Sequence, residues 1–281
     1  MSPDVRTRPM TVADMAMVLD WAAAEGWNPG RHDGDCFRAI DPGGFIIGEL
    51  DGAPVASISV VNYDHRFAFL GFYIVPPDLR GRGYGWRTWQ AGLAHGGARN
   101  IGLDGVVAQQ DNYRKSGFKL AYRNIRFTGR VAGGEAPADR RLVNLAAIPF
   151  DELVAYDRPL FPAPRSGFLR AWAGHPAHVA LGLVERDALV GYGVLRPCRQ
   201  DYKIGPLFAD SEDAANILFE ALSAQAGGPV YLDVPEVNPA AVALAERHGM
   251  TPVFETARMY TGPAPAVDLA RVFGVTSFEL G

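Results

Sequence analysis

The stretch that decides the fold reads Val75-Pro76-Pro77-Asp78-Leu79-Arg80-Gly81-Arg82-Gly83-Tyr84-Gly85-Trp86. An apolar run, residues 67–75, leads into it and an amphipathic run, residues 86–99, follows, which predicts the order strand, glycine-rich turn, helix. Glycines at alternate positions leave the backbone open to a ligand, and amides at the start of a helix attract anions. With two arginines beside these glycines, the stretch predicts a pocket for a phosphate or pyrophosphate.

The spacing of this stretch excludes two common phosphate-binding motifs. A dinucleotide fingerprint requires a glycine where this chain has Trp86, and a P-loop requires Gly-Lys followed by Ser or Thr, which is absent. Residues 80–85 instead resemble the acyl-CoA loop of the GNAT superfamily of N-acetyltransferases, whose pattern is Gln or Arg, two residues, Gly, one residue, Gly or Ala. The resemblance implies an α/β (α+β) fold and acetyl-CoA as co-substrate. It also implies that acetyl-CoA contacts Ile74, Val75, Arg80, Gly81, Arg82, Gly83, Tyr84 and Gly85.

A second motif lies at residues 111–118, Asp-Asn-Tyr-Arg-Lys-Ser-Gly-Phe. It resembles the GNAT segment Tyr-x-Lys-x-Gly-Phe, which ends a short helix before the last strands. The resemblance implies that Tyr113 is the general acid and that Lys115 lies near the cofactor. Few residues separate this motif from the strand expected at residues 101–107, so we expect a brief helix. A purely structural role for Tyr113 is the alternative.

The N-terminal region predicts a helix followed by a polar loop. Thr11 and Asp14 have the spacing of a capping box, and an apolar face follows at Met15, Val18, Leu19 and Ala22. In a GNAT-like fold the segment between the first two helices covers the acceptor, which makes Trp27, His32 and Asp33 candidate substrate contacts; a solvated loop over a buried Trp27 is the alternative. Further on, Asp51-Gly52 between two β-rich runs predicts a hairpin.

The second half of the chain resembles a weak repeat of the first. Gly117 and Arg126 match Gly249 and Arg258 at one offset of 132 residues, and Leu103-Asp104 resembles Leu232-Asp233. The segment 204–213 stands where the glycine turn should be, yet it has one glycine, no arginine and three acids near its end. We therefore expect two GNAT-like domains, each a mixed, mostly antiparallel sheet flanked by helices: a catalytic domain at 1–130, a linker at 131–140 and a degenerate domain without acyl-CoA binding at 141–281.

Acyl transfer to an amine also requires a base, which the sequence leaves open. Many GNAT proteins carry an acid on the strand before the turn, and residues 67–75 contain none. His32, Asp33, Asp64, His65 and a relayed water remain candidates. In the helix after the turn, Trp86, Trp89 and Leu93 recur at helical spacing, and we expect both tryptophans to pack against the sheet.

Composition limits the class of protein. The formal net charge of −4 argues against a general nucleic-acid binder, and 48% hydrophobic residues suffice for a core. No apolar run is long enough to cross a membrane, and the N-terminus has no apolar signal core. The two cysteines and six histidines show no metal-ligand spacing, so no metal is expected. A cytoplasmic protein is the simplest interpretation, and a homodimer is left open.

These features predict an acetyl-CoA-dependent N-acetyltransferase that transfers the acetyl group to an amine by direct attack in a ternary complex. A small molecule or a peptide could supply the amine, and no nucleic acid or membrane partner is expected. The alternative is a non-catalytic acyl-CoA-binding sensor or scaffold that kept the loop and lost turnover.

Overall fold

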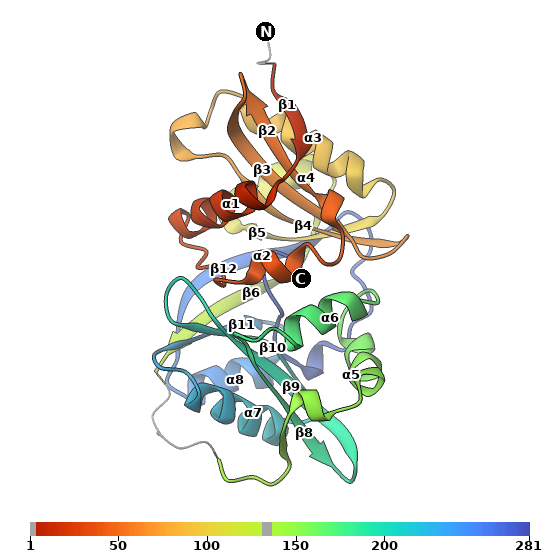
Figure 1. Cartoon of the computed structure of the whole chain (residues 1–281), viewed down its shortest axis with the longest axis vertical. Helices are drawn as coiled ribbons and strands as arrows, with labels where there is room; N and C mark the ends of the chain where they lie inside the picture. Colours follow the sequence, from red (N-terminus) through yellow and green to blue (C-terminus); the bar gives the residue numbers. More distant parts are fainter. Residues whose placement is uncertain (1–3, 131–136) are drawn as a thin grey trace.

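A computed structural model of the chain describes residues 4–130 and 137–281 (Figure 1). Most of the linker expected at 131–140, namely 131–136, lies outside the described residues. Figure 1 shows two α/β halves stacked along the long axis, with sheet running through both. Among the described residues, no helix has the length and apolar character needed to cross a bilayer.

The first half follows the order expected from the sequence. Its strands are β1 (Arg6–Pro9), β2 (Phe45–Leu50), β3 (Ala53–Asn62), β4 (Phe67–Ile74), β5 (Asn100–Val106) and β6 (Lys119–Gly129). Its helices are α1 (Val12–Ala24), α2 (Asp33–Phe37), α3 (Tyr84–Gly96) and α4 (Gln110–Lys115), with short 3-10 turns between them. The capping box at Thr11 and Asp14, the hairpin at Asp51-Gly52 and the brief helix before Gly117 are all confirmed.

The second half repeats this order. Its strands are β7 (Leu142–Asn144), β8 (Val179–Glu185), β9 (Ala188–Pro197), β10 (Tyr202–Ala209), β11 (Val230–Pro235), β12 (Thr251–Tyr260) and β13 (Val272–Gly274). Its helices are α5 (Phe150–Asp157), α6 (Ser166–Ala173), α7 (Glu212–Ala224) and α8 (Pro239–Arg247). Thus β10, α7 and β11 occupy the places that β4, α3 and β5 occupy in the first half.

The two halves exchange their last long strands. Within the described residues the sheet runs β1-β2-β3-β4-β5-β12-β6-β11-β10-β9-β8-β7, and β13 pairs with β10 off this path. Strand β12 of the second half therefore lies between β5 and β6 of the first, and β6 pairs on its other side with β11 of the second half. All of these pairings are antiparallel. Each half thus completes the sheet of the other.

Two buried ion pairs hold the exchanged strands. Arg126 on β6 stands opposite Asp233 on β11 and donates to both of its carboxylate oxygens at 2.6 and 2.8 Å. Arg258 on β12 stands opposite Asp104 on β5 and makes the same two-point contact at 2.8 and 2.6 Å. These are residues that the internal repeat matches, so one pair is the repeat copy of the other.

The helices cover the sheet where small residues permit close approach. A Cβ on Gly92 of α3 would lie 2.7 Å from the Ile58 side chain on β3. In the second half, a Cβ on Gly193 of β9 would lie 2.6 Å from the Leu222 side chain on α7. These contacts set α3 against β3 and α7 against β9, which are equivalent strands of the two halves.

The ion pairs lead to a stability prediction. Removal of one partner from a buried pair leaves an uncompensated charge, so Asp233→Ala is expected to lower the free energy of unfolding by about 3–5 kcal/mol. The control is Asp111→Ala, whose ion pair with Arg114 is exposed and should contribute less than about 1 kcal/mol. Denaturant unfolding of both variants measures the difference. Equal losses would contradict a clamping role for the buried pair.

Candidate active site

The candidate site begins where β4 and β5 separate, a place called the fork of the first domain below. The two strands are parallel and paired from Phe67 with Asn100 to Leu70 with Leu103, and no pairing continues beyond. Phe72 has a positive φ of 47°, an unusual conformation for a bulky residue, and its carbonyl accepts a hydrogen bond from Ser57 Oγ at 2.7 Å. The register with β3 shifts at the same place. This bulge turns the end of β4 away from β5 and leaves backbone amides on that edge without a strand partner.

The glycines of the turn after β4 have different structural roles. Gly81 and Gly83 have φ of 74° and 80°, a region that favours glycine, and Gly83 is the residue before the first turn of α3. A Cβ on Gly81 would meet nothing within 4 Å. Gly85 is a packing residue instead, because a Cβ there would lie 2.5 Å from Tyr73 Oη and 2.7 Å from the Val75 side chain. The turn is therefore open at Gly81, while Gly85 lets α3 sit close to β4.

The two arginines of the turn also differ. Arg80 Nε donates to the Val75 carbonyl at 2.9 Å, and its Nη2 pairs with Glu25 just after α1. Arg82 is exposed. Arg80 therefore ties the turn to the end of β4, and Arg82 supplies positive charge at the open turn.

A cavity of about 650 Å³ lies between this turn and α4. Of the cofactor contacts expected from sequence, it is lined by Ile74, Val75, Arg80 and Lys115; residues 81–85 belong to the adjoining turn. Trp86 also lines it and is 56% exposed, so the expectation that Trp86 packs against the sheet is wrong. Trp86 stands in the first turn of α3, at the helix end that borders the cavity, whereas Trp89, one turn further along, is buried.

Tyr113 lies at the inner end of this cavity in a fixed aromatic cluster. Its ring stacks on Trp89 with centroids 5.9 Å apart, and Trp89 meets Tyr73 edge-on at 4.9 Å. Trp89 Nε1 donates to Ser116 Oγ at 3.0 Å, which fixes the indole. A Cβ on Gly105 would lie 2.2 Å from the Tyr113 ring, so the ring lies directly against β5. These contacts leave Tyr113 little freedom to reorient.

Burial raises the pKa of Tyr113 to about 12, with a smaller contribution from Tyr73. The phenol is therefore protonated throughout the physiological range. A group in this state donates a hydrogen bond and does not act as a base.

A smaller cavity of about 40 Å³ continues inward from the first. Both cavities are lined by Trp27, Tyr73, Val106 and Tyr113, so they meet at the tyrosine. The inner cavity is otherwise largely apolar, and its charged lining residues within the described chain are Asp104 and Glu279. Asp104 is paired with Arg258, as described above. The two cavities together form a passage through the fork between β4 and β5.

Comparison with known proteins identifies this arrangement. The model of the acetyltransferase (GNAT) family matches residues 15–118, and the model of the acetyltransferase (GNAT) domain matches residues 153–274. A holothin acyltransferase from Pseudoalteromonas sp. (strain SANK 73390) is 32% identical over 277 residues, which cover 98% of this chain and 94% of that protein. The chain belongs to the GNAT acetyltransferase family. It is an acyltransferase with two GNAT domains.

Solved structures show the same fold over the whole chain. A Pyrococcus horikoshii protein proposed to be an acetyltransferase superposes with a TM-score of 0.84 at 21% identity, over 99% of this chain and 96% of that one. A tandem GNAT protein from the clavulanic acid biosynthesis pathway superposes with a TM-score of 0.64 at 15% identity, over 93% of this chain and 100% of that one. The tandem arrangement expected from the internal repeat is therefore confirmed.

The second GNAT domain has an equivalent fork between β10 and β11, and there the fork is filled by backbone. Strand β13 pairs with β10 opposite Leu207 and Phe208, and the Val275 amide donates to the Asp233 carbonyl on β11. Helix α7 starts after the N-cap residue Ser211, two residues after β10 ends, so no glycine loop intervenes. The acidic first turn of α7, Glu212 and Asp213, repels phosphate.

The structure separates the three candidate acceptor contacts. Trp27 lines both cavities. Asp33 is fully buried and accepts hydrogen bonds from Arg196 Nε at 2.9 Å and from the Gly30 amide at 2.8 Å, so it links the domains. Neither Asp33 nor His32 is among the residues that line the two cavities. Asp64 and His65 lie in the turn before β4, at the end of the strand opposite the fork.

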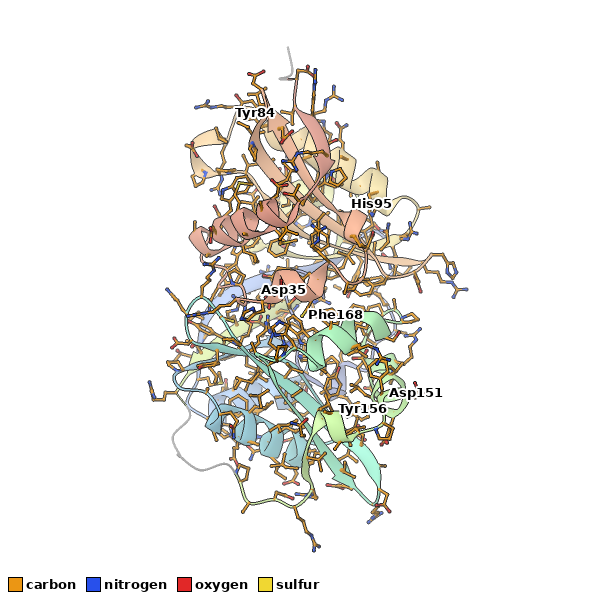
Figure 2. All side chains as sticks on the ribbon, viewed as in Figure 1. Asp35, Tyr84, His95, Asp151, Tyr156 and Phe168 are labelled. Atoms are coloured by element: carbon orange, nitrogen blue, oxygen red, sulfur yellow. The ribbon has the colours of Figure 1, made fainter. Side chains whose placement is uncertain are left out.

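One cluster of metal-ligand type was not apparent from sequence. His32, Asp35 and His175 place three ligand atoms within 4.8 Å of one another, and the histidine rings are 4.9 Å apart. Asp35 and Tyr84, labelled in Figure 2, lie far apart, with Asp35 near the join of the two domains. Three ligand atoms are fewer than the four of a structural zinc site, and Asp35 is exposed. Neither His32 nor His175 lines the cavities described above.

Proposed function

We propose that this chain transfers an acetyl group from acetyl-CoA to an amine by direct attack in a ternary complex. The observation that carries the proposal is the passage through the fork of the first domain, with an open glycine turn at one end and a half-buried tyrosine at the junction. The relative named for acyl transfer to holothin supports the reaction class and leaves the acceptor of this chain open.

The residues present fit acetyl-CoA. Gly81 and Gly83 keep the start of α3 accessible, Arg82 and Lys115 are exposed cations beside it, and the outer cavity is large enough for an extended thiol arm. Trp86 offers an exposed ring at the same entrance. When bound, acetyl-CoA supplies the activated acetyl thioester.

Backbone amides and Tyr113 would stabilise the charges that develop during acyl transfer. The amides at the end of β4, near Ile74 and Val75, would donate to the oxygen on which negative charge develops. Tyr113 would donate a hydrogen bond to the departing sulfur. Since its pKa is about 12 and that of a thiol is about 8.5, complete proton transfer to a free thiolate is uphill by about 5 kcal/mol. Tyr113 therefore acts while the carbon–sulfur bond is breaking.

We propose the acceptor to be a small molecule or a peptide amine, and the compartment to be the reducing cytoplasm. Cys36 and Cys198 are both free thiols buried in the protein, which suits a reducing compartment. The function is tested by release of CoA thiol over a broad amine panel, and absence of release with every amine would count against it.

The glycine turn leads to a binding prediction. Gly83→Val is expected to abolish CoA binding measured by calorimetry, because the side chain would enter the path of the phosphates. Gly52→Val is the matched control, since Gly52 also has a φ of 80° but lies in the β2–β3 turn. Normal affinity in a folded Gly83→Val protein would contradict the assignment of the loop.

The filled second fork predicts one CoA site per chain. Calorimetry on the wild-type protein is expected to give a stoichiometry near one, because β13 occupies the second fork and α7 begins with acids. A stoichiometry of two would show that the second GNAT domain also binds.

Tyr113→Phe tests the role of the phenol. Turnover is expected to fall about 10²–10⁴-fold, the usual range for a positioned acid or base, while CoA affinity stays the same. The control is Tyr231→Phe on β11, outside both cavities. A variant that melts normally and keeps more than about a third of its turnover would remove Tyr113 from the mechanism.

A further inference from the structure

The segment after β13 brings a carboxylate into the fork of the first domain. Residues 275–281 cross from the second domain to β4, held by a hydrogen bond from Tyr63 Oη to the Leu280 carbonyl at 2.9 Å and by one from the Gly281 amide to the Ser277 carbonyl at 3.0 Å. A Cβ on Gly71 would lie 2.3 Å from the backbone oxygen of Glu279. The absence of a side chain at Gly71 is therefore what admits Glu279 at the point where β4 leaves β5.

The Glu279 carboxylate is buried without a partner. The residue is 3% exposed, and neither carboxylate oxygen has a hydrogen-bond partner among residues 4–130 and 137–281. It lines the inner cavity together with Trp27 and Tyr113. Asp104, the other acid there, is already bound to Arg258. An unpaired buried carboxylate is costly, so its position calls for a ligand that supplies the missing donors.

The surrounding charges leave Glu279 available. The charged groups near it are Lys203, Asp33, Arg126 and Arg196. Arg126 is bound to Asp233 and Arg196 to Asp33, and Lys203 Nζ donates to the Asn28 carbonyl at 3.1 Å. Burial raises the pKa of Glu279, with Asp33 adding to the rise and Lys203 opposing it. A raised pKa makes the carboxylate a stronger base than an exposed glutamate.

We propose that Glu279 binds the ammonium group of the acceptor and takes its proton, and that the acceptor is a monoamine on an apolar, aromatic or alkyl body. This inference rests on the proposed function and assigns the base that the sequence left open. The residues considered from sequence lack these properties. Asp33 is engaged by Arg196, and His32 lines neither cavity. Asp64 and His65 lie beyond the far end of β4.

The lining of the inner cavity selects the acceptor class. Besides Glu279, the cavity is lined mainly by aromatic and aliphatic residues; the aromatic ones are Trp27, Phe72, Tyr73, Tyr113, Phe254 and Phe278. One free carboxylate among the described lining residues matches one ammonium group, whereas a polyamine or an amino sugar would bring further polar groups into an apolar space. The small volume, about 40 Å³, admits the amino group and the carbons next to it.

Glu279, Tyr113 and the two reactants account for every proton and bond in the transfer. Glu279 takes one proton from the ammonium group, which leaves a neutral amine with a free lone pair. The nitrogen–carbon bond then forms and the carbon–sulfur bond breaks. The second proton of the nitrogen passes to sulfur by way of Tyr113, which ends the step protonated. The products are the amide, the free thiol and protonated Glu279, which returns its proton to solvent.

The test measures amine binding directly and does not depend on turnover. Calorimetry in the presence and absence of CoA compares benzylamine with benzyl alcohol, and butylamine with butanol. The wild-type protein is expected to bind each amine more tightly than its alcohol. Glu279→Gln is expected to weaken amine binding about 10- to 100-fold, the range for one charge-assisted contact, and to leave alcohol binding unchanged. Glu279→Asp should retain part of the preference.

A matched control separates a binding role from a structural one. Glu246→Gln removes the same charge at an exposed position on α8 and should change neither amine binding nor melting temperature. Glu279→Gln should melt at or above the wild-type temperature, because a neutral amide replaces an unpaired buried charge. Glu279→Gln with full amine preference, or a wild-type protein that prefers no amine over its alcohol, would overturn the proposal. A lowered melting temperature of Glu279→Gln with intact amine preference would make Glu279 a structural counter-ion of Lys203 and would also overturn the proposal.

The acetyl-CoA site and the Glu279 site can be tested independently of each other. Amine preference that depends on Glu279 without CoA binding would refute acetyl-CoA as the donor and leave the acceptor site standing. CoA binding and turnover with no effect of Glu279→Gln on amine binding would refute the role of Glu279 and leave acetyl-CoA standing as the donor. In an active enzyme, the rise of kcat/KM with pH that reports Glu279 should also disappear in Glu279→Gln.

Discussion

The crossed pair of arginine–aspartate contacts is the constraint on which the rest of the structure depends. Each aspartate stands on the second arm of a fork, and each arginine stands on the last long strand of the opposite domain. Because the carboxylate and guanidinium of each pair are buried, neither can lose its partner without a large desolvation penalty. The pairs therefore set the register of β6 and β12 and, through it, the position of both forks.

The Arg126–Asp233 pair is connected to the candidate site by the side chain of Phe278. The Arg126 guanidinium lies over the ring of Phe278, 4.6 Å from its centroid, and Phe278 precedes Glu279. Strand exchange thus positions Arg126, Arg126 contacts the 275–281 segment at Phe278, and the next residue of that segment, Glu279, lines the inner cavity. The two forks differ in what enters them: backbone from β13 fills the second, while a side chain with a free carboxylate reaches the first.

What could be predicted from sequence was local. The turn at Gly81 and Gly83, the capping box at Thr11 and the short helix before Gly117 each depend on a few neighbouring residues, and the repeat carried the tandem arrangement. Strand exchange could not be predicted, because β6 satisfies the same apolar pattern whichever domain it pairs with. The repeat matched Arg126 with Arg258 and Asp104 with Asp233, but it did not indicate which domain supplies the partner of each arginine. Glu279 lies more than 160 residues from Tyr113 in sequence, and only the three-dimensional fold brings both to one cavity.

The exchange of β6 and β12 also bears on how such a chain can evolve. Two identical subunits that trade their last strands would give the same strand order, with two equal forks related by a twofold axis. In that assembly every substitution changes both forks at once. Joined in one chain, the copies vary independently, so Ser211 can start a helix where the other copy keeps glycines. A single segment can then complete one centre without a counterpart in the other. Covalent fusion thus frees the two copies from the symmetry that identical subunits would impose on them.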